Sequence, residues 1–290
     1  MTDAIRWITV LRRLGLFVLA FAGTSAVTIT PLATFLSDWA DAYPIRGRLY
    51  ADVAGALAVV SATWVMTKFV DKRAFLTIGF ATKGIIRDLS IGLALGTAWL
   101  GISVVVMMGF GWASLLSPPG LSGTLVAIAA VSVLFNVATQ QLLVCGYILQ
   151  TLRSKAGLPV AIFLSALLFS ALHAAAFQGA WLPPINVFAA GLVFCLAYAI
   201  TGNLWLPVAI HFAWNLLLGP VLGLTISGTG ELGLGWEAFE ITGPELYTGG
   251  VFGIEGGLIV TLTTAGLVMI FLLIRARQDV SVREGAFRSP

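Results

Sequence analysis

Two histidines and a pair of adjacent amides stand out in this sequence because all four lie inside runs of apolar residues. His173 ends the run Leu-Leu-Phe-Ser-Ala-Leu-His, His211 lies in Leu-Pro-Val-Ala-Ile-His-Phe-Ala-Trp-Asn, and Gln140 and Gln141 interrupt a third run. An imidazole titrates near neutral pH, so it can transfer a proton or bind a metal. Ionisable groups in apolar helices are costly and usually face a cavity. These residues therefore favour a functional site over structural roles.

The spacing on two of these runs places a second side chain beside each histidine. Phe169 and His173 are four residues apart, and so are His211 and Asn215. Residues four apart share one face of a helix. We therefore expect Asn215 to orient His211, or a group that His211 holds.

Gln141 and Cys145 have the same spacing on the third run. A glutamine amide forms hydrogen bonds, but it cannot take a proton from water as a carboxylate general base can. Cys145 would be a nucleophile if it were paired with a histidine, but a cysteine in an apolar run more often packs as a small hydrophobic residue. We expect packing for Cys145 and Cys195, and no disulfide framework.

The histidines could also hold a metal, but their ligand set is incomplete. A catalytic zinc site generally uses three protein ligands. His173 and His211 supply two imidazoles, and a neutral amide is a poor third ligand. Glu255, which lies among glycines, is expected to satisfy hydrogen bonds at a helix junction rather than to catalyse.

Composition places these residues in a membrane protein. The chain has 290 residues, of which 59% are hydrophobic and 10% charged, and its mean hydropathy is +0.98. Soluble domains carry about 25% charged residues. The net charge of +3 does not indicate nucleic-acid binding, because the positions of the charges explain it better.

The apolar runs predict an all-α polytopic bundle of about eight membrane spans. A spanning helix needs about 20 mostly apolar residues. We expect one integrated membrane domain made of N-terminal helices (1–121), core helices with the polar residues (122–227), and an outward loop, last span and basic tail (228–290). The expected spans are 14–37, 50–70, 89–112, 122–151, 157–176, 184–201, 203–227 and 250–274.

The basic residues predict the orientation of the chain. With eight spans, all lysines and arginines except Arg46 and Arg48 fall on one side of the membrane. Cytoplasmic loops carry the excess of such residues, so both termini are expected in the cytoplasm. The first segment resembles a signal peptide, but its apolar run continues through Phe35, and a retained span is expected. Residues 74–87 mix apolar and basic residues, as an interfacial segment does.

Three short motifs, in order along residues 125–220, resemble the CPBP family of intramembrane proteases, which includes CAAX proteases and bacteriocin-processing proteins. The family pattern is Glu-Glu-x-x-x-Arg, Phe-x-x-x-His and His-x-x-x-Asn. Phe169 and His173 match the second motif, and His211 and Asn215 match the third. The first motif is recognisable from its surrounding residues.

This resemblance implies a bacterial cytoplasmic membrane protein that hydrolyses peptide bonds of membrane-associated, hydrophobic or prenylated peptides. In the family, a glutamate is thought to activate the attacking water, while the histidines and the asparagine stabilise the oxyanion. A competing mechanism makes the same groups metal ligands.

The first motif departs from the family at its charged positions. Gln140 and Gln141 stand in place of the glutamates, and Cys145 in place of the arginine. An arginine without its carboxylate partner would be a buried unpaired charge, so the changes look like the joint loss of one ion pair. The sequence therefore predicts impaired hydrolysis.

Three alternatives follow from these departures. The chain is a catalytically inactive pseudoprotease that binds a hydrophobic peptide or a membrane partner, or else His173 or His211 replaces the missing base. A small transporter is disfavoured because no internal symmetry or paired broken helices are visible.

Overall fold

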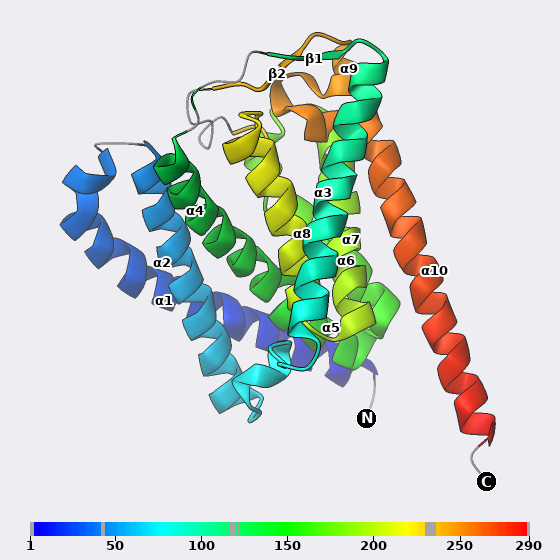
Figure 1. The fold of residues 1–290 in the computed structure, drawn as a ribbon. Helices are drawn as coiled ribbons and strands as arrows, with labels where there is room; N and C mark the ends of the chain where they lie inside the picture. Colours follow the sequence, from blue (N-terminus) through cyan, green and yellow to red (C-terminus); the bar gives the residue numbers. More distant parts are fainter. Residues whose placement is uncertain (1–2, 42–43, 117–119, 121, 230–235, 289–290) are drawn as a thin grey trace.

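The computed structural model describes residues 3–41, 44–116, 120, 122–229 and 236–288, which fold almost entirely as helices (Figure 1). The longer helices are α1 (Asp3–Asp41), α2 (Pro44–Val65), α3 (Ile85–Gly109), α4 (Gly123–Gln141), α6 (Leu158–Ala171), α7 (Leu182–Thr201), α8 (Trp205–Leu216) and α10 (Leu258–Arg288). The π-helical turns η1 (Met66–Val70), η3 (Leu142–Ile148) and η5 (Leu217–Val221) continue α2, α4 and α8, and α5 (Leu149–Ala156) follows η3. Shorter elements are η2 (Phe75–Ile78), β1 (Ala113–Leu115), η4 (Ala174–Ala176), β2 (Phe239–Ile241), α9 (Glu245–Thr248), η7 (Gly250–Phe252) and η8 (Ile254–Gly256).

The predicted polytopic helical bundle is confirmed. Among the described residues, six helical segments are long and apolar enough to cross a membrane, namely Trp7–Ile29, Ile45–Val70, Ile85–Gly109, Gly123–Ala156, Leu182–Thr201 and Leu258–Val280. Two further apolar helices, Leu158–Ala171 and Trp205–Val221, are shorter. The spans expected at 157–176 and 203–227 were therefore drawn too long.

The chain reverses direction in the segment between α6 and α7. Gln178 and Gly179 both adopt positive φ angles, of 48° and 81°, which reverse the chain. Pro183 then lies in the first turn of α7, where a missing backbone N–H costs nothing. His173 lies between the end of α6 at Ala171 and η4 instead of inside a helix, which corrects the sequence-based placement.

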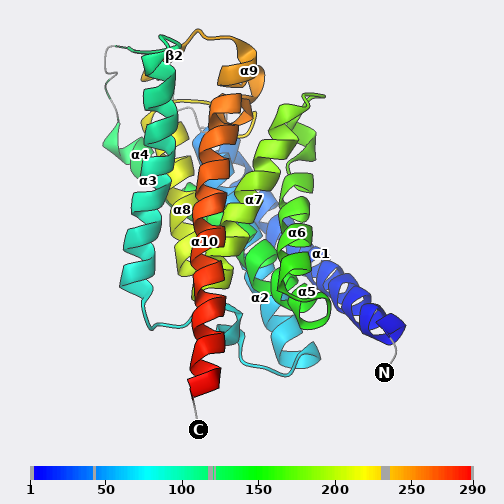
Figure 2. The ribbon, with the colours of Figure 1, turned by 90° about the vertical axis from the view of Figure 1, so that its right-hand side faces the viewer.

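The helices alternate in direction through the bundle. The strands β1 and β2 and the short helix α9 cover one end, which we call the capped end (Figure 1). Helices α2, α4, α7 and α10 run away from the capped end, and α3, α6 and α8 run toward it (Figures 1 and 2). The start of α1 and the end of α10 both lie at the opposite end, while α1 lies obliquely against α2. The chain therefore begins and ends on one side of the bundle.

A short antiparallel sheet at the capped end was not predicted. In it, Ala113 of β1 pairs with Ile241 of β2, and Leu115 pairs with Phe239. The sheet joins the end of α3 to the loop that precedes α10. It thus ties together two segments that are far apart in sequence.

Small residues bring α3 against α8. A Cβ atom built on Gly92 would lie 2.5 Å from Cβ of Ala209, and one on Gly96 would lie 2.8 Å from Cβ of Ala213. This close packing fixes the helix that carries His211. The glycines at 219–223 and 249–257 have the same four-residue spacing, but they lie largely in turns and short helical segments.

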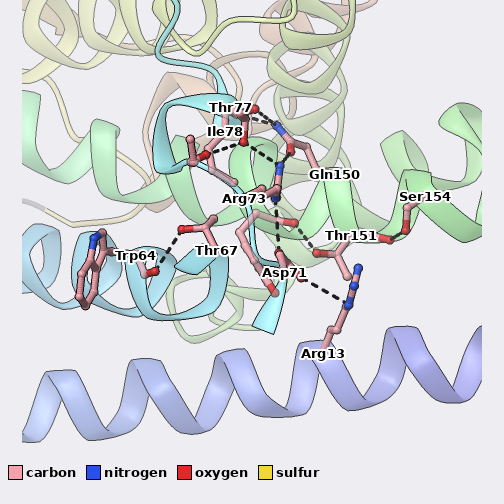
Figure 3. Close-up of polar contacts among 12 residues, drawn as sticks. Arg13, Trp64, Thr67, Asp71, Arg73, Thr77, Ile78, Gln150, Thr151 and Ser154 are labelled. Carbon is pink, nitrogen blue, oxygen red and sulfur yellow. Dashed lines mark hydrogen bonds and ion pairs between the residues drawn. The ribbon is translucent and has the colours of Figure 1, made fainter. Parts of the chain in front are cut away.

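A polar cluster at the opposite end fixes the segment that was predicted to be interfacial (Figure 3). Asp71 forms ion pairs with Arg13 of α1, at 3.4 Å, and with Arg73, at 3.5 Å. Arg73 also donates to Gln150 of α5, and Gln150 donates to the carbonyl of Ile78 at 3.0 Å. Residues 71–78 are thereby held between α1 and α5.

The α3–α8 contact predicts a stability effect. We expect Gly96→Ala to destabilise the protein by about 1–3 kcal/mol, because the added methyl group overpacks the contact with Ala213. Thermal unfolding in detergent micelles measures this change. Gly101→Ala is the matched control on the same helix, since a Cβ there meets nothing within 4 Å. Equal melting temperatures for the two variants would contradict the close packing.

Candidate active site

Three separate elements bring the predicted site residues to two adjoining pockets. The first, which we call the histidine pocket, has a volume of about 30 Å³ and is lined by His173, His211, Asn215 and other residues, among them Phe169, Phe194, Trp214, Ser227 and Glu255. The second, which we call the amide pocket, has a volume of about 190 Å³; its lining includes Arg48, Asn136, Gln140, His173, Asn215 and Ser227. His173, Asn215 and Ser227 line both pockets, so the two form one continuous polar region.

The imidazole of His211 is held on every side. Its Nδ1 lies 3.0 Å from Nε2 of Gln141, and its Nε2 lies 3.2 Å from the side-chain amide of Asn215. Phe194 stacks on the ring at 4.6 Å between centroids, and Phe169 presents its edge at 5.8 Å. The ring is therefore fixed in position, with both nitrogens engaged.

Gln141 fixes the tautomer of this ring. It is fully buried, and its carbonyl oxygen accepts from the thiol of Cys145 at 3.1 Å, which leaves its amide NH₂ to donate to Nδ1 of His211. A neutral imidazole has one acceptor and one donor nitrogen. We therefore infer that Nε2 of His211 carries the proton, and that Asn215 turns its oxygen toward it.

Cys145 packs in the protein interior and lines neither pocket. Its sulfur is 3.7 Å from the sulfur of Cys195, and both residues are fully buried. Neither cysteine forms a disulfide. Their positions fit the expected packing role. Cys145 is buried away from both pockets, so it is not placed to act as a nucleophile.

His173 has the opposite arrangement from His211. Its Nδ1 lies 2.8 Å from the carbonyl oxygen of Phe169, to which it donates as N–H. Its Nε2 then carries a lone pair, and the partly exposed ring lines both pockets. Phe169 thus fixes the second histidine as well, with its carbonyl as acceptor and its ring packed beside both imidazoles.

Gln140 is held by a chain of hydrogen bonds that sequence reasoning missed. Gln140 donates to the oxygen of Asn136 at 2.8 Å, and Asn136 donates to Asp52 at 2.8 Å. Asp52 is buried on α2, where it also accepts from Ser132 at 2.5 Å and from Arg48 at 3.2 Å. The four-residue spacing of Arg48 and Asp52 was the available signal for this ion pair.

Glu255 joins three parts of the chain beside the histidine pocket. Its carboxylate accepts from the indole N–H of Trp214 at 2.8 Å, from the backbone N–H of Ser227, and from the hydroxyl of Ser227 at 3.2 Å. Asn186 donates to its backbone carbonyl at 2.8 Å. These contacts fit the expected junction role. The sequence did not reveal that Glu255 also lines the histidine pocket.

The donor geometry does not fit a metal centre. Within the part of the chain that the structure describes, no three or more histidine, cysteine, aspartate or glutamate residues group closely enough to hold one ion. Both nitrogens of His211 are already engaged.

The hypothesis that Gln141 and Cys145 replace one ion pair can be tested by the free energy of unfolding of variants at these two positions. We expect Cys145→Arg and Gln141→Glu to destabilise the protein by about 3–5 kcal/mol each, because each buries an unpaired charge. The double variant should recover most of that loss if the two positions once formed a pair. Unfolding in detergent measures the four corners of this cycle.

Cys145→Met separates bulk from charge in this cycle. It adds volume next to Cys195 without a charge and should cost only about 1–3 kcal/mol. If the double variant Cys145→Arg, Gln141→Glu lost as much stability as the two single variants added together, the two introduced charges would not stabilise each other. That result would contradict the loss of one ion pair at these positions.

Comparison with known proteins agrees with the motifs. Residues 122–217 match the family model of type II CAAX prenyl endopeptidase Rce1-like proteins. The matched segment runs from the start of α4 to the end of α8, so it holds the three motifs. No curated protein and no solved structure matches the chain. Over residues 122–217 the chain is therefore similar to Rce1-like proteins of the type II CAAX prenyl endopeptidase family, in agreement with the resemblance that the motifs indicated.

Proposed function

We propose that this protein binds a hydrophobic or prenylated peptide within the membrane and hydrolyses it as a CAAX-type endopeptidase with weakened activity. One observation carries the proposal. Residues of all three motifs, namely Gln140, His173 and Asn215, line the amide pocket together, and the motif glutamate position there holds an amide.

The fixed tautomers assign complementary tasks to the two histidines. The N–H at Nε2 of His211 meets Asn215 in the free site, and it can donate instead to the oxyanion that forms when water attacks a peptide carbonyl, once the bound peptide displaces that contact. Nε2 of His173 can accept a hydrogen bond from the water or from the peptide N–H. Gln140 can orient the water, but it takes no proton from it. A general base contributes about 10²–10⁴-fold to such a step, which is the scale of the expected loss.

A second candidate function is binding without cleavage. The observation that favours it is the neutral lining at the first motif, where Gln140 is bonded to Asn136 and Gln141 to His211. A pocket of this kind can hold a peptide or a partner's helix by hydrogen bonds alone. An inactive pseudoprotease with an immunity or scaffolding role would use the same residues.

We also propose that both ends of the chain lie in the cytoplasm of a bacterial cell. Arg153, Lys155 and Arg275 lie at the end of the bundle opposite the capped end, where α5 and the last part of α10 are found (Figure 2). The excess of positive charge on the cytoplasmic side of membrane proteins supports this orientation. The capped end, whose loops border both pockets, then faces outward.

Restoring the carboxylate tests the proposed function. We expect Gln140→Glu to raise the hydrolysis of a fluorogenic prenyl-peptide by about 10²-fold, because the pocket regains a general base. Asn136 must turn its NH₂ group from Asp52 to the new carboxylate, while Ser132 and Arg48 still hold Asp52. Purified protein in detergent or proteoliposomes is the sample, and the rate is read by fluorescence.

Gln178→Glu is the matched control, since Gln178 lies at the capped end outside both pockets. It should leave the rate unchanged, and His211→Ala should abolish the gain from Gln140→Glu. Peptide binding without hydrolysis in the parent and in Gln140→Glu would favour the second candidate. Neither binding nor hydrolysis in any form would refute the proposed function.

A further inference from the structure

The histidine pocket holds a carboxylate even though the first motif has lost its own. Glu255 lies in η8, the short helical segment directly before α10, and its side chain lines this pocket. It lines the pocket together with His173, His211 and Asn215, and its side chain is only partly buried. A group with the chemistry that Gln140 and Gln141 lack is therefore present beside the same residues.

The carboxylate is fixed relative to the helix that carries His211. Trp214, which donates to Oε1 of Glu255, lies three residues after His211 and directly before Asn215. Both bonds from Ser227 go to Oε2, while Trp214 is the donor described at Oε1. A carboxylate oxygen has about two acceptor sites. Oε1 therefore retains one site for a further donor, such as a water molecule.

The backbone of Glu255 is fixed as well. Asn186 of α7 donates to the carbonyl of Glu255 at 2.8 Å and to that of Gly257 at 3.0 Å. Thr261 of α10 donates in turn to the oxygen of Asn186 at 2.7 Å. A residue that served only as a spacer between β2 and α10 would need no such support. The whole segment is held in place at the pocket wall.

We propose that Glu255 is the general base of the parent protein and replaces, less effectively, the glutamate that the first motif has lost. The proposal rests on the proposed function. In the step, the carboxylate takes a proton from water as the water oxygen bonds to the peptide carbonyl carbon, and His211 donates to the resulting oxyanion. The protonated Glu255 then gives that proton to the leaving amine as the C–N bond breaks, so the carboxylate is regenerated.

The environment of Glu255 agrees with this role. Burial raises the pKa of Glu255 above its ordinary value, although the bonds from Ser227 and Trp214 partly offset the effect. A base works best when its pKa approaches the operating pH. His173 is the rival base, because its Nε2 also carries a lone pair.

Removal and chemical replacement of the carboxylate test the proposal. We expect Glu255→Gln to lower the hydrolysis of the prenyl-peptide by about 10²-fold with peptide affinity retained, and Glu255→Asp to fall between the two. We expect added formate, but not imidazole, to raise the rate of Glu255→Ala at least about tenfold by replacing the lost carboxylate. Glu240→Gln, on the exposed strand β2, is the matched control and should keep the parental rate.

Each other outcome overturns the proposal. If Glu255→Gln keeps more than about a third of the parental rate, the loss of rate is far smaller than removal of a general base would cause, and the base lies elsewhere. If His173→Ala is rescued by imidazole and Glu255→Ala is not rescued by formate, His173 is the base. If every Glu255 variant loses peptide binding and thermal stability together, the residue is structural. A parent that binds peptide without hydrolysing it refutes this role but leaves peptide binding intact, whereas absence of binding refutes the proposed function itself.

Discussion

The hydrogen bond between Gln141 and His211 is the interaction on which the rest of the site depends. It joins the end of α4 to the middle of α8, and it sets which nitrogen of the ring carries a proton. The close contact of α3 with α8 limits any shift of that helix, and Phe194 and Phe169 limit rotation of the ring. A fully buried amide serves this purpose well, because it satisfies the imidazole without bringing a charge out of water.

The neutral residue at position 140 of the first motif suits the charged residues nearby. Asp52 and Arg48 form an ion pair four residues apart on α2, and Asp52 is linked through Asn136 to Gln140. Every donor in this chain points toward Asp52. A glutamate at position 140 would compete with Asp52 for the single NH₂ group of Asn136. The amide at 140 is therefore consistent with its neighbours, and a change there would be felt across two helices.

The sequence could predict the parts of this site that depend on local spacing. Four-residue intervals placed Phe169 beside His173 and Asn215 beside His211, and hydropathy predicted the helical bundle that brings them together. It could not show that Asp52 is buried, because Ser132 and Asn136 cover it from a helix about 80 residues away in the chain. The turn at Gln178 was also missed, since a non-glycine residue with positive φ leaves little trace in composition.

The position of Glu255 shows why a motif alone does not decide whether a site is active. A motif fixes which helix supplies a group, whereas the reaction requires only that a carboxylate lie near the water and the oxyanion donors. Here a segment between β2 and α10 brings a carboxylate to the histidine pocket, whereas α4 brings only amides to the adjoining amide pocket. Trp214 and Ser227 hold that carboxylate with three hydrogen bonds, and donors of this kind stabilise its charged form. A carboxylate that lines the same pocket as two imidazoles contributes to the local field, so even as a purely structural residue Glu255 would influence how His211 meets an oxyanion.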